Sequence, residues 1–229
     1  GGLRALQEAG HLELITCAAT HGVLPLLGRA EAVRAQVEQG CRAHERWFGR
    51  RPGGFWLPEC AYEPGLERFL APAGCEYFFL DSHGVLLADP EPEGGVFAPV
   101  RTPGGPAAFG RDVETSKQVW SRDEGYPGDF DYREFHRDLG YDGDWDEVRP
   151  CLATDERHHI GIKYHRITGH GEEKQPYRPE AAAARAREHA RHFVQSRREQ
   201  VRRLAGHLEA PPVMVAPYDA ELFGHWWFE

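Results

Sequence analysis

The stretch that most constrains the fold is a short apolar run that stops at a proline and is followed at once by a single carboxylate. It reads GFWLPECAY over residues 54–62, with Pro58 directly before Glu59. Such a run predicts a buried strand, because strands in α/β proteins are apolar on both faces. Ligands collect outside the carboxyl ends of such strands. The pattern therefore places Glu59 where a catalytic group would stand.

A second stretch has the same order of features. The run VMVA at residues 213–216 precedes PYDAELFGHWW at residues 217–227, so Asp219 also follows a predicted strand. Aromatic residues surround both carboxylates. Two carboxylates at equivalent strand ends, with aromatic residues around both, suggest chemistry on a glycosidic bond.

Length and charge narrow the class of protein. A chain of 229 residues can bury one sizeable core, and α/β barrels of about this length often form one domain. The formal net charge of −9 and the pI near 5.8 argue against nucleic acid or an anionic membrane as partner. We see neither a signal peptide nor an apolar run of the roughly 20 residues that span a bilayer. We therefore expect a cytoplasmic protein that acts on a neutral substrate.

The cysteines indicate neither a disulfide framework nor a structural zinc site. They are odd in number and form no CxxC pair, so we expect reduced thiols, no metal and no cofactor. One alternative is a metal-dependent polysaccharide deacetylase, which needs an Asp and two His around one metal. Imidazoles are present at His158, His159 and His165, but their spacing defines no ligand set. The five cysteines are Cys17, Cys41, Cys60, Cys75 and Cys151.

The first third of the chain alternates predicted strands and helices. Strands are predicted over residues 11–16, 54–57 and 77–81, with helices over 29–48 and 64–70 between them. A βαβαβ series implies parallel strands joined by right-handed crossovers. Side chains that follow the strands, among them His21, Asp81 and His83, are therefore expected at the same end as Glu59. His11 and Glu13 adjoin the first strand and are also candidates.

From residue 85 to residue 179 the periodic pattern is lost. Proline, glycine and charged residues dominate, and a stretch of this length is too long for a plain loop. We expect an inserted, mostly irregular cap subdomain over the site. Its aromatic residues, such as Trp120 and Tyr126, could stack on sugar faces, yet the residues alone favour an ordinary small core. A strong helix is predicted over residues 180–205, and it leads into the Asp219 segment.

Taken together, several phrases resemble glycoside hydrolase family 57 and, within it, the 1,4-α-glucan branching enzymes. Three of them, GHLEL, FWLPEC and PYDAELFGHW, are similar to three of the five sequence regions of the family. Two more are similar to an insertion of the branching subgroup. The five phrases begin at Gly10, Phe55, Pro217, Val119 (VWS, continuing to GYPG) and Gly161 (GIKYHRITG).

The resemblance implies an α/β fold, an incomplete (β/α)7 barrel with the cap inserted. Residues 1–84 would form its first part, 85–179 the cap and 180–229 the last helix and strand. Glu59 would be the nucleophile and Asp219 the general acid/base of a retaining transglycosylase that cuts α-1,4-glucan and rejoins it as an α-1,6 branch. The expected carboxyl separation is about 5 to 5.5 Å. Substrate contacts are expected from His11, Glu13, His21, Trp56, Asp81, His83, Phe109, Arg111, Trp120, Tyr126, His225 and Trp226.

The chain also departs from the family pattern. The first region, the fifth region and the helical C-terminal domain have no counterpart here, so we expect an internal piece of a longer enzyme. Phe109 is expected at the tip of a mobile loop where branching enzymes carry a tyrosine. Two alternatives stay open: an α-amylase or 4-α-glucanotransferase of the same family, and a catalytically silent glucan-binding fragment.

Overall fold

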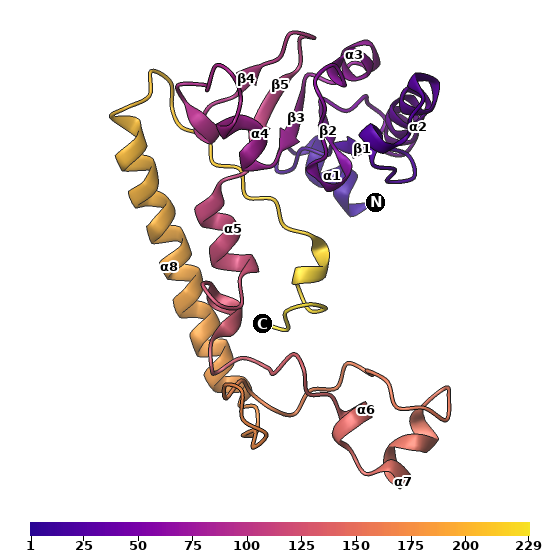
Figure 1. Cartoon of the computed structure of the whole chain (residues 1–229), viewed down its shortest axis with the longest axis vertical. Helices are drawn as coiled ribbons and strands as arrows, with labels where there is room; N and C mark the ends of the chain where they lie inside the picture. Colours follow the sequence, from indigo (N-terminus) through magenta and orange to yellow (C-terminus); the bar gives the residue numbers. More distant parts are fainter. The chain divides into compact units, whose positions relative to one another are not determined.

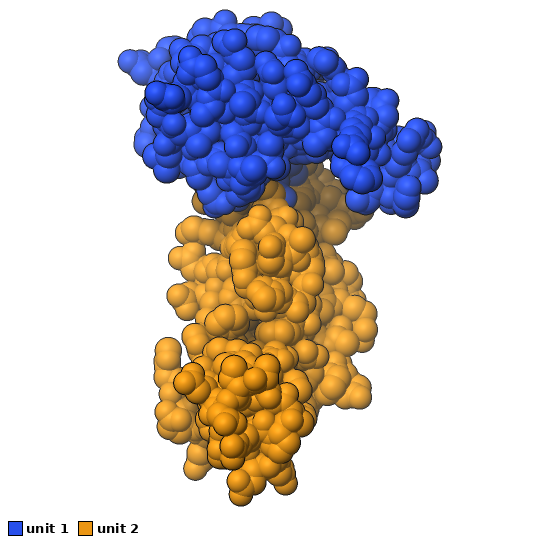
Figure 2. Space-filling view, turned by 90° about the vertical axis from the view of Figure 1, so that its right-hand side faces the viewer, with its two compact units in different colours: residues 1–112, 205–216 blue, residues 113–204, 217–229 orange.

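The computed structural model describes residues 1–229, and the chain divides into two compact units (Figure 2). Unit 1 comprises Gly1–Asp112 and Ala205–Ala216, and unit 2 comprises Val113–Leu204 and Pro217–Glu229. The boundary therefore follows Asp112, whereas the sequence predicts a cap from residue 85 onward.

Unit 1 is built on a five-stranded sheet with helices between its strands (Figure 1). Several 3₁₀ turns extend the connections, at Leu24–Leu26, Pro58–Cys60, Ala71–Ala73 and Gly95–Phe97. The regular elements are α1 (Gly2–Glu8), β1 (Thr16–Cys17), α2 (Ala30–Phe48), β2 (Gly54–Trp56), α3 (Glu67–Leu70), β3 (Tyr77–Leu80), α4 (Ser82–Leu86), β4 (Val100–Arg101) and β5 (Ala107–Gly110).

The strand order is β1-β2-β3-β5-β4. Strands β1, β2, β3 and β5 are parallel, and the parallel pairing of the first three is what the βαβαβ pattern predicts. Strand β4 is antiparallel to β5. Strands β4 and β5 come from the stretch expected to be cap. They were hidden in the sequence because a four-residue strand among prolines and glycines carries almost no periodic signal.

The two faces of the sheet differ in burial. In β3 and β5 burial alternates residue by residue, so Phe78 and Ala108 are buried while Phe79 and Phe109 are half-buried. The buried face packs against apolar residues of α2, α3 and α4, including Val37. Both faces of these strands carry apolar side chains, as predicted. The aromatic rings on one face, however, are only half-buried.

Helix α2 confirms the helix predicted over residues 29–48. Its buried residues Val33, Val37, Cys41 and His44 recur every three or four positions, which is one helix face. The helix ends at Gly49, whose φ of 79° lies in the left-handed region that glycine adopts freely. This helix contributes Val33, Val37 and Cys41 to the apolar core of unit 1.

Unit 2 contains the longest helix of the chain, α8 (Pro179–Ala205, assigned to this unit as far as Leu204), as predicted for residues 180–205. None of the helices in the chain has both the length and the apolar character needed to cross a membrane. Short helices and 3₁₀ turns make up the remaining elements: α5 (Val113–Trp120), α6 (Leu139–Asp142), α7 (Trp145–Val148), and turns at Tyr126–Gly128, Arg149–Cys151 and Ala220–Leu222.

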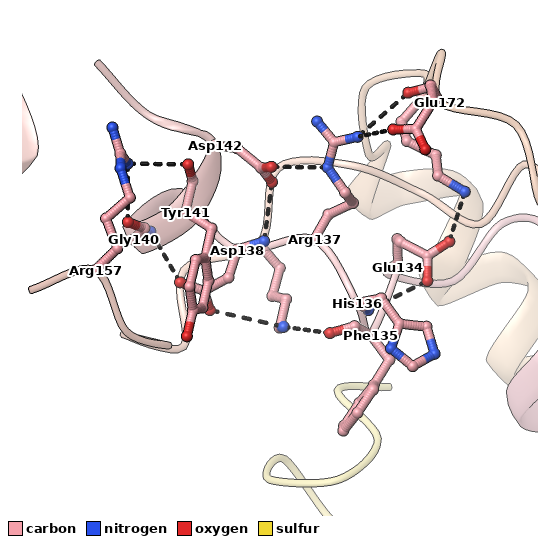
Figure 3. Close-up of polar contacts among 12 residues, drawn as sticks. Glu134, Phe135, His136, Arg137, Asp138, Gly140, Tyr141, Asp142, Arg157 and Glu172 are labelled. Atoms are coloured by element: carbon pink, nitrogen blue, oxygen red, sulfur yellow. Dashed lines mark hydrogen bonds and ion pairs between the residues drawn. The ribbon is translucent and has the colours of Figure 1, made fainter. Parts of the chain in front are cut away.

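Buried ion pairs, more than apolar packing, organise the loops of unit 2 (Figure 3). The Asp138 carboxylate is fully buried and accepts hydrogen bonds from the backbone N–H groups of Gly140, Ile160 and Gly161 at 2.9 to 3.0 Å. Burial alone would raise the pKa of Asp138, but these three hydrogen bonds and the charge of Lys163 lower it. Such fully paired carboxylates hold irregular backbone in one conformation.

A second buried carboxylate ties the same region together. Glu134 pairs with Lys174 at 3.0 Å and with Arg122 at 3.6 Å. Burial would raise the pKa of Glu134, and the bonds from Lys174 and the His136 backbone, with the two cations, lower it. The apolar core of this unit is small by comparison, with Tyr132 and Ile167 among its few buried residues.

Of the predicted strands, one is much shorter than expected and another is absent. The strand at residues 11–16 is reduced to Thr16–Cys17. Residues 213–216 form no strand, and Val215 makes one isolated bridge with Arg111. Prolines at 211, 212 and 217 flank this segment, and a proline cannot donate to a ladder.

Candidate functional site

Glu59 lies in a strained turn directly after β2. Its φ is 59° and that of Cys60 is 53°, a region that side chains other than glycine rarely adopt. The turn is closed by hydrogen bonds from Cys60 N–H to Leu57 O at 2.9 Å and from Ala61 N–H to Pro58 O at 3.1 Å. The Glu59 side chain is 73 % exposed. Strain of this kind is kept where surrounding structure enforces it, and it concentrates at active sites.

His21 reaches Glu59 from the loop after β1. Its Nε2 lies 3.1 Å from Oε1 of Glu59, and its own φ is also positive, at 55°. Helix α2 holds this loop through Gln36, which accepts two hydrogen bonds from it. The side-chain oxygen of Gln36 accepts from the backbone N–H of Thr20 at 2.9 Å, and its backbone carbonyl accepts from the N–H of Ala19 at 3.1 Å. The structure thus joins two predicted site residues, and Gln36 is a positioning residue that the sequence did not reveal.

A second polar cluster follows β3 and β5. Asp81 lies 3.0 Å from Ser82 Oγ, 3.3 Å from His83 Nδ1 and 3.5 Å from Arg111 Nη1. Burial would raise the pKa of Asp81, but the bonds from Ser82 and His83 and the Arg111 charge lower it. An ionised carboxylate facing one guanidinium and one imidazole can hold sugar hydroxyls as acceptor and donors.

These residues share one edge of the sheet. His21, Glu59, Asp81 and Arg111 follow β1, β2, β3 and β5, and those strands are parallel. Their carboxyl ends therefore lie along the same edge, where open α/β sheets bind ligands. The sequence prediction that Asp81 and His83 lie at the Glu59 end follows from this topology.

An aromatic wall lies on the half-buried face of the same strands. The ring centroids of Trp56 and Phe79 are 6.1 Å apart, as are those of Phe79 and Phe109. Phe109 therefore lies inside strand β5 and not at the tip of a mobile loop, which corrects the expectation from the resemblance. Its ring also meets Tyr77 edge-on at 5.6 Å. A strand residue packed between two rings cannot act as a loop gate.

His11 and Glu13 lie elsewhere. They precede β1, and the carboxylate of Glu13 neighbours Gly53, just before β2, and Tyr77, the first residue of β3. Burial and then the hydrogen bond to Glu13 raise the pKa of Tyr77. These two candidates are thus at the amino ends of the strands, the opposite edge from Glu59. Strand β1 begins at Thr16 and not at residue 11 as predicted. His11 and Glu13 therefore precede the strand and lie at its amino end, not at the carboxyl end where Glu59 lies.

Unit 2 carries the second predicted carboxylate. Asp219 is exposed and lies directly before the 3₁₀ turn Ala220–Leu222. The backbone N–H of Leu222 donates a hydrogen bond to the backbone carbonyl of Asp219 at 3.1 Å. Trp120 Nε1 donates to Pro217 O at 3.4 Å, and its ring lies 5.7 Å from that of Trp226. His225 lies next to Trp226, with ring centroids 6.5 Å apart. Trp120, His225 and Trp226 thus gather around the Asp219 segment, and the distance from Asp219 to Glu59 stays a prediction.

Tyr126 lies on α8. Its hydroxyl is 2.8 Å from His192 Nδ1, and its ring stacks on His189 at 4.5 Å. Tyr126 and His189 line an apolar hollow of about 340 Å³, together with residues such as Phe193 and Trp227. The α8 residues at this hollow recur at helical spacing, so the sequence could have found them, but a stripe of that kind is most simply interpreted as core.

No group of three or more His, Cys, Asp or Glu side chains in the structure is arranged to hold a metal ion. No disulfide joins the five cysteines. The site chemistry available from the chain itself is that of carboxylates, imidazoles, one guanidinium and aromatic faces.

Comparison with known sequences decides the family. The profile described as Glycosyl hydrolase family 57 matches residues 1–225. This chain belongs to glycosyl hydrolase family 57. Over its whole length it is 42 % identical to a 1,4-alpha-glucan branching enzyme of Thermococcus kodakarensis, of which it covers 36 %. The chain therefore spans little more than a third of that family 57 relative.

Two solved structures are similar over 99 % of the chain. One is the alpha-amylase AmyC from Thermotoga maritima, with a TM-score of 0.90, 46 % identity and 45 % of that chain covered. The other is a GH57-type branching enzyme from Pyrococcus horikoshii, with a TM-score of 0.82, 41 % identity and 41 % of that chain covered. The mixed α/β fold with a mostly parallel sheet is thus the fold of family 57 members.

Proposed function

We propose that this chain carries catalytic residues of a 1,4-α-glucan branching enzyme. The enzyme would cut an α-1,4 bond, hold the released chain on Glu59 as a glycosyl ester and transfer it to a sugar 6-hydroxyl. The observation that carries the proposal is the placement of Glu59, which is exposed on a strained turn at the carboxyl end of β2 with His21 at 3.1 Å. The family membership and the branching-enzyme relative support the substrate class.

The Glu59–His21 contact suits a nucleophile. An ionised carboxylate only accepts hydrogen bonds, so a nucleophilic Glu59 would accept from Nε2 of His21. The donated bond fixes one carboxylate oxygen and leaves the other to attack the anomeric carbon. Asp219 would protonate the leaving sugar oxygen and then take the proton of the incoming hydroxyl. Direct attack requires the two carboxyl groups to lie about 5 to 5.5 Å apart.

The fold supports the proposed barrel. Four parallel strands with helices on one face and a half-buried aromatic face on the other have the layering of a barrel wall. We propose that these strands belong to an incomplete (β/α)7 barrel. We place the start of the cap at Val113, where unit 2 begins, because β4 and β5 belong to the sheet of unit 1. Residues 180–229 would contribute the last barrel helix and the Asp219 loop.

Substrate contacts are proposed for both units. In unit 1 they come from His21, Trp56, Asp81, His83 and Arg111, which lie at or near the strand ends. In unit 2 they come from Trp120, Tyr126, His225 and Trp226. Aromatic faces stack on pyranose rings and also exclude water, and water exclusion favours transfer to a sugar over hydrolysis.

The second candidate is an α-amylase, and one observation favours it. The structure of the Thermotoga maritima alpha-amylase has a higher TM-score and identity to this chain than the Pyrococcus horikoshii branching enzyme. Both activities use the same pair of carboxylates, and they differ in whether a sugar or water accepts the glycosyl group. The products therefore decide between them.

The test uses the complete protein with amylose as substrate. Debranching followed by chain-length analysis measures α-1,6 linkages, and a reducing-end assay on the same sample measures hydrolysis. We expect α-1,6 linkages with little reducing sugar. Release of maltose or short linear sugars without α-1,6 linkages would establish the amylase instead.

Variants of one loop test the assignment of the nucleophile. Glu59→Gln should lower the rate of either reaction at least about 1,000-fold, because an amide cannot form the glycosyl ester. Glu63→Gln is the matched control, since Glu63 is exposed in the same loop. Equal loss in both variants, or an active Glu59→Gln enzyme, would refute the role of Glu59.

A further inference from the structure

Two buried cysteines of unit 1 touch each other away from the candidate site. Cys41 is on helix α2, and Cys75 follows the 3₁₀ turn Ala71–Ala73, just before β3. Their sulfur atoms are 3.7 Å apart, and their exposed fractions are 5 % and 3 %. A disulfide needs about 2.05 Å between the sulfur atoms, so an approach of about 1.7 Å would close the bond.

Cys41 borders a surface hollow on unit 1. The hollow has a volume of about 450 Å³, and Cys75 is absent from its lining. Four arginines and two glutamates line it, a formal excess of positive charge. They are Arg34, Arg42, Arg51, Arg68, Glu38 and Glu45. The hollow thus offers small reagents an approach to Cys41 that its lining does not offer to Cys75.

The pair is also electronically asymmetric. The hydrogen bond between the two thiols is the largest influence on Cys41 and lowers its pKa; burial opposes this and Arg51 assists it. The same bond and burial raise the pKa of Cys75. Cys41 also lines the hollow together with Arg51, so we take its sulfur as the one that reacts first, as the thiolate, which is the nucleophilic form of cysteine.

We propose that Cys41 and Cys75 form an oxidation site that small hydroperoxides convert to a disulfide. The Cys41 thiolate attacks the peroxide, so an S–O bond forms and the O–O bond breaks. Hydroxide leaves and takes up a proton, and Cys41 becomes a sulfenic acid. The Cys75 sulfur then attacks Cys41, an S–S bond forms, and the sulfenic oxygen departs as water with the Cys75 proton. Hydrogen peroxide is the oxidant, and the two thiols are oxidised together by two electrons.

Oxidation would fix helix α2 to the segment that enters β3. The bond closes a long loop, because the two cysteines are 34 positions apart in sequence. Cross-links of this span restrict the unfolded chain, so the oxidised protein should melt roughly 5 to 10 °C higher than the reduced protein. The same helix holds the His21 loop through Gln36, so that loop should exchange its amide hydrogens more slowly.

Peptide mapping of the complete protein tests the site directly. The reduced protein is treated with hydrogen peroxide, digested without reductant and analysed by mass spectrometry. A peptide pair joined through Cys41 and Cys75 is expected, while the exposed Cys151 is the internal control for non-selective oxidation. Oxidation of Cys151 with Cys41 and Cys75 left as thiols would overturn the proposal.

Variants then test the order of the steps. Cys75→Ala removes the second sulfur, so the reaction should stop at a sulfenic acid on Cys41 that dimedone traps. Cys41→Ala should leave Cys75 without an adduct. An adduct on Cys75 would contradict the order. If neither variant folds, the disulfide found in the unaltered protein still decides the proposal.

Two charge changes in the hollow should act in opposite directions. Arg51 lowers the pKa of Cys41 and Glu45 raises it. Arg51→Gln should slow Cys41 oxidation and Glu45→Gln should quicken it, each by roughly two- to fivefold at low salt, as exposed charges allow. A purely structural thiol pair predicts no opposite pair of effects. Changes of the same sign would refute attack by the Cys41 thiolate.

Discussion

Replacing Gly40 by alanine separates two physical effects that usually act together. Gly40 is buried in the middle of α2, where alanine is favoured over glycine by about 1 kcal/mol. A Cβ at this position would lie 2.1 Å from the carbonyl oxygen of Cys17 in β1. An ordinary C···O contact is about 3.3 Å, so helix and strand must separate by about 1 Å. Helix propensity and packing therefore predict opposite signs.

The magnitude follows from what that separation breaks. Thr16 donates its hydroxyl to the Gly40 carbonyl at 2.9 Å, and a shift of this size lengthens the bond beyond a useful distance, at about 1 kcal/mol. Overpacking costs about 1 to 3 kcal/mol more. The gain of about 1 kcal/mol in helix propensity offsets about as much as the lost hydrogen bond costs. Gly40→Ala should therefore destabilise unit 1 by the overpacking cost, about 1 to 3 kcal/mol.

Urea unfolding followed by circular dichroism measures the loss, and hydrogen exchange of residues 16–21 shows whether the His21 loop loosens. The control is Gly84→Ala in α4, where the new Cβ would meet Leu80 at 3.6 Å, an ordinary contact. That variant should be neutral or slightly stabilised. If Gly40→Ala is as stable as the unaltered protein, the close approach of α2 to β1 is not what holds this edge.

Two further predictions concern unit 2. Asp138→Asn should destabilise it by about 3 to 5 kcal/mol, because Lys163 is left buried without its counter-charge. The control Asp155→Asn changes an exposed carboxylate and should cost less than about 1 kcal/mol. Urea unfolding followed by tryptophan fluorescence measures both. The folded-state pKa values of Glu134 and Asp138 lie below their ordinary 4.5 and 3.8, so their stabilisation is complete above those values and is lost as pH falls below them. Unfolding measured from pH 6 to pH 3 should show this loss, and a pH-independent stability would exclude it.

Most of unit 1 could be predicted from sequence because its signals are local. Helix α2 has a periodic apolar face and a glycine stop, and the run ending at Pro58 marks β2 and its carboxylate. The carboxyl-edge placement of Asp81 then follows from parallel pairing. The β5 strand was missed because AAFG carries no alternation, so nothing in the sequence pattern opposed the loop position that the family resemblance implied for Phe109.

The positions of His11 and Glu13 show a different limit. A residue beside a strand lies at one edge or the other depending on where the strand begins, and strand ends are set by pairing partners that periodicity does not reveal. The ion-pair network of unit 2 was equally hidden. Glu134 and Asp138 read as surface charges among many, and only the fold brings Lys174 and Lys163 to them.

One helix links the site loop, the sheet and the cysteine pair. On α2, Gln36 holds the loop of His21, Gly40 touches β1 and Cys41 faces Cys75. Gly40→Ala should push this helix away from the strand by about 1 Å, and Cys41 must move with it. If the helix moves away from Cys75, the yield of peroxide-induced disulfide falls along with stability. If it pivots toward Cys75, the yield rises while the His21 loop still loosens. A changed disulfide yield together with a loosened His21 loop would show that Cys41 and Gln36 move together, which is the condition for thiol oxidation to reach the loop that contacts Glu59. A change in only one of the two readouts would refute this coupling.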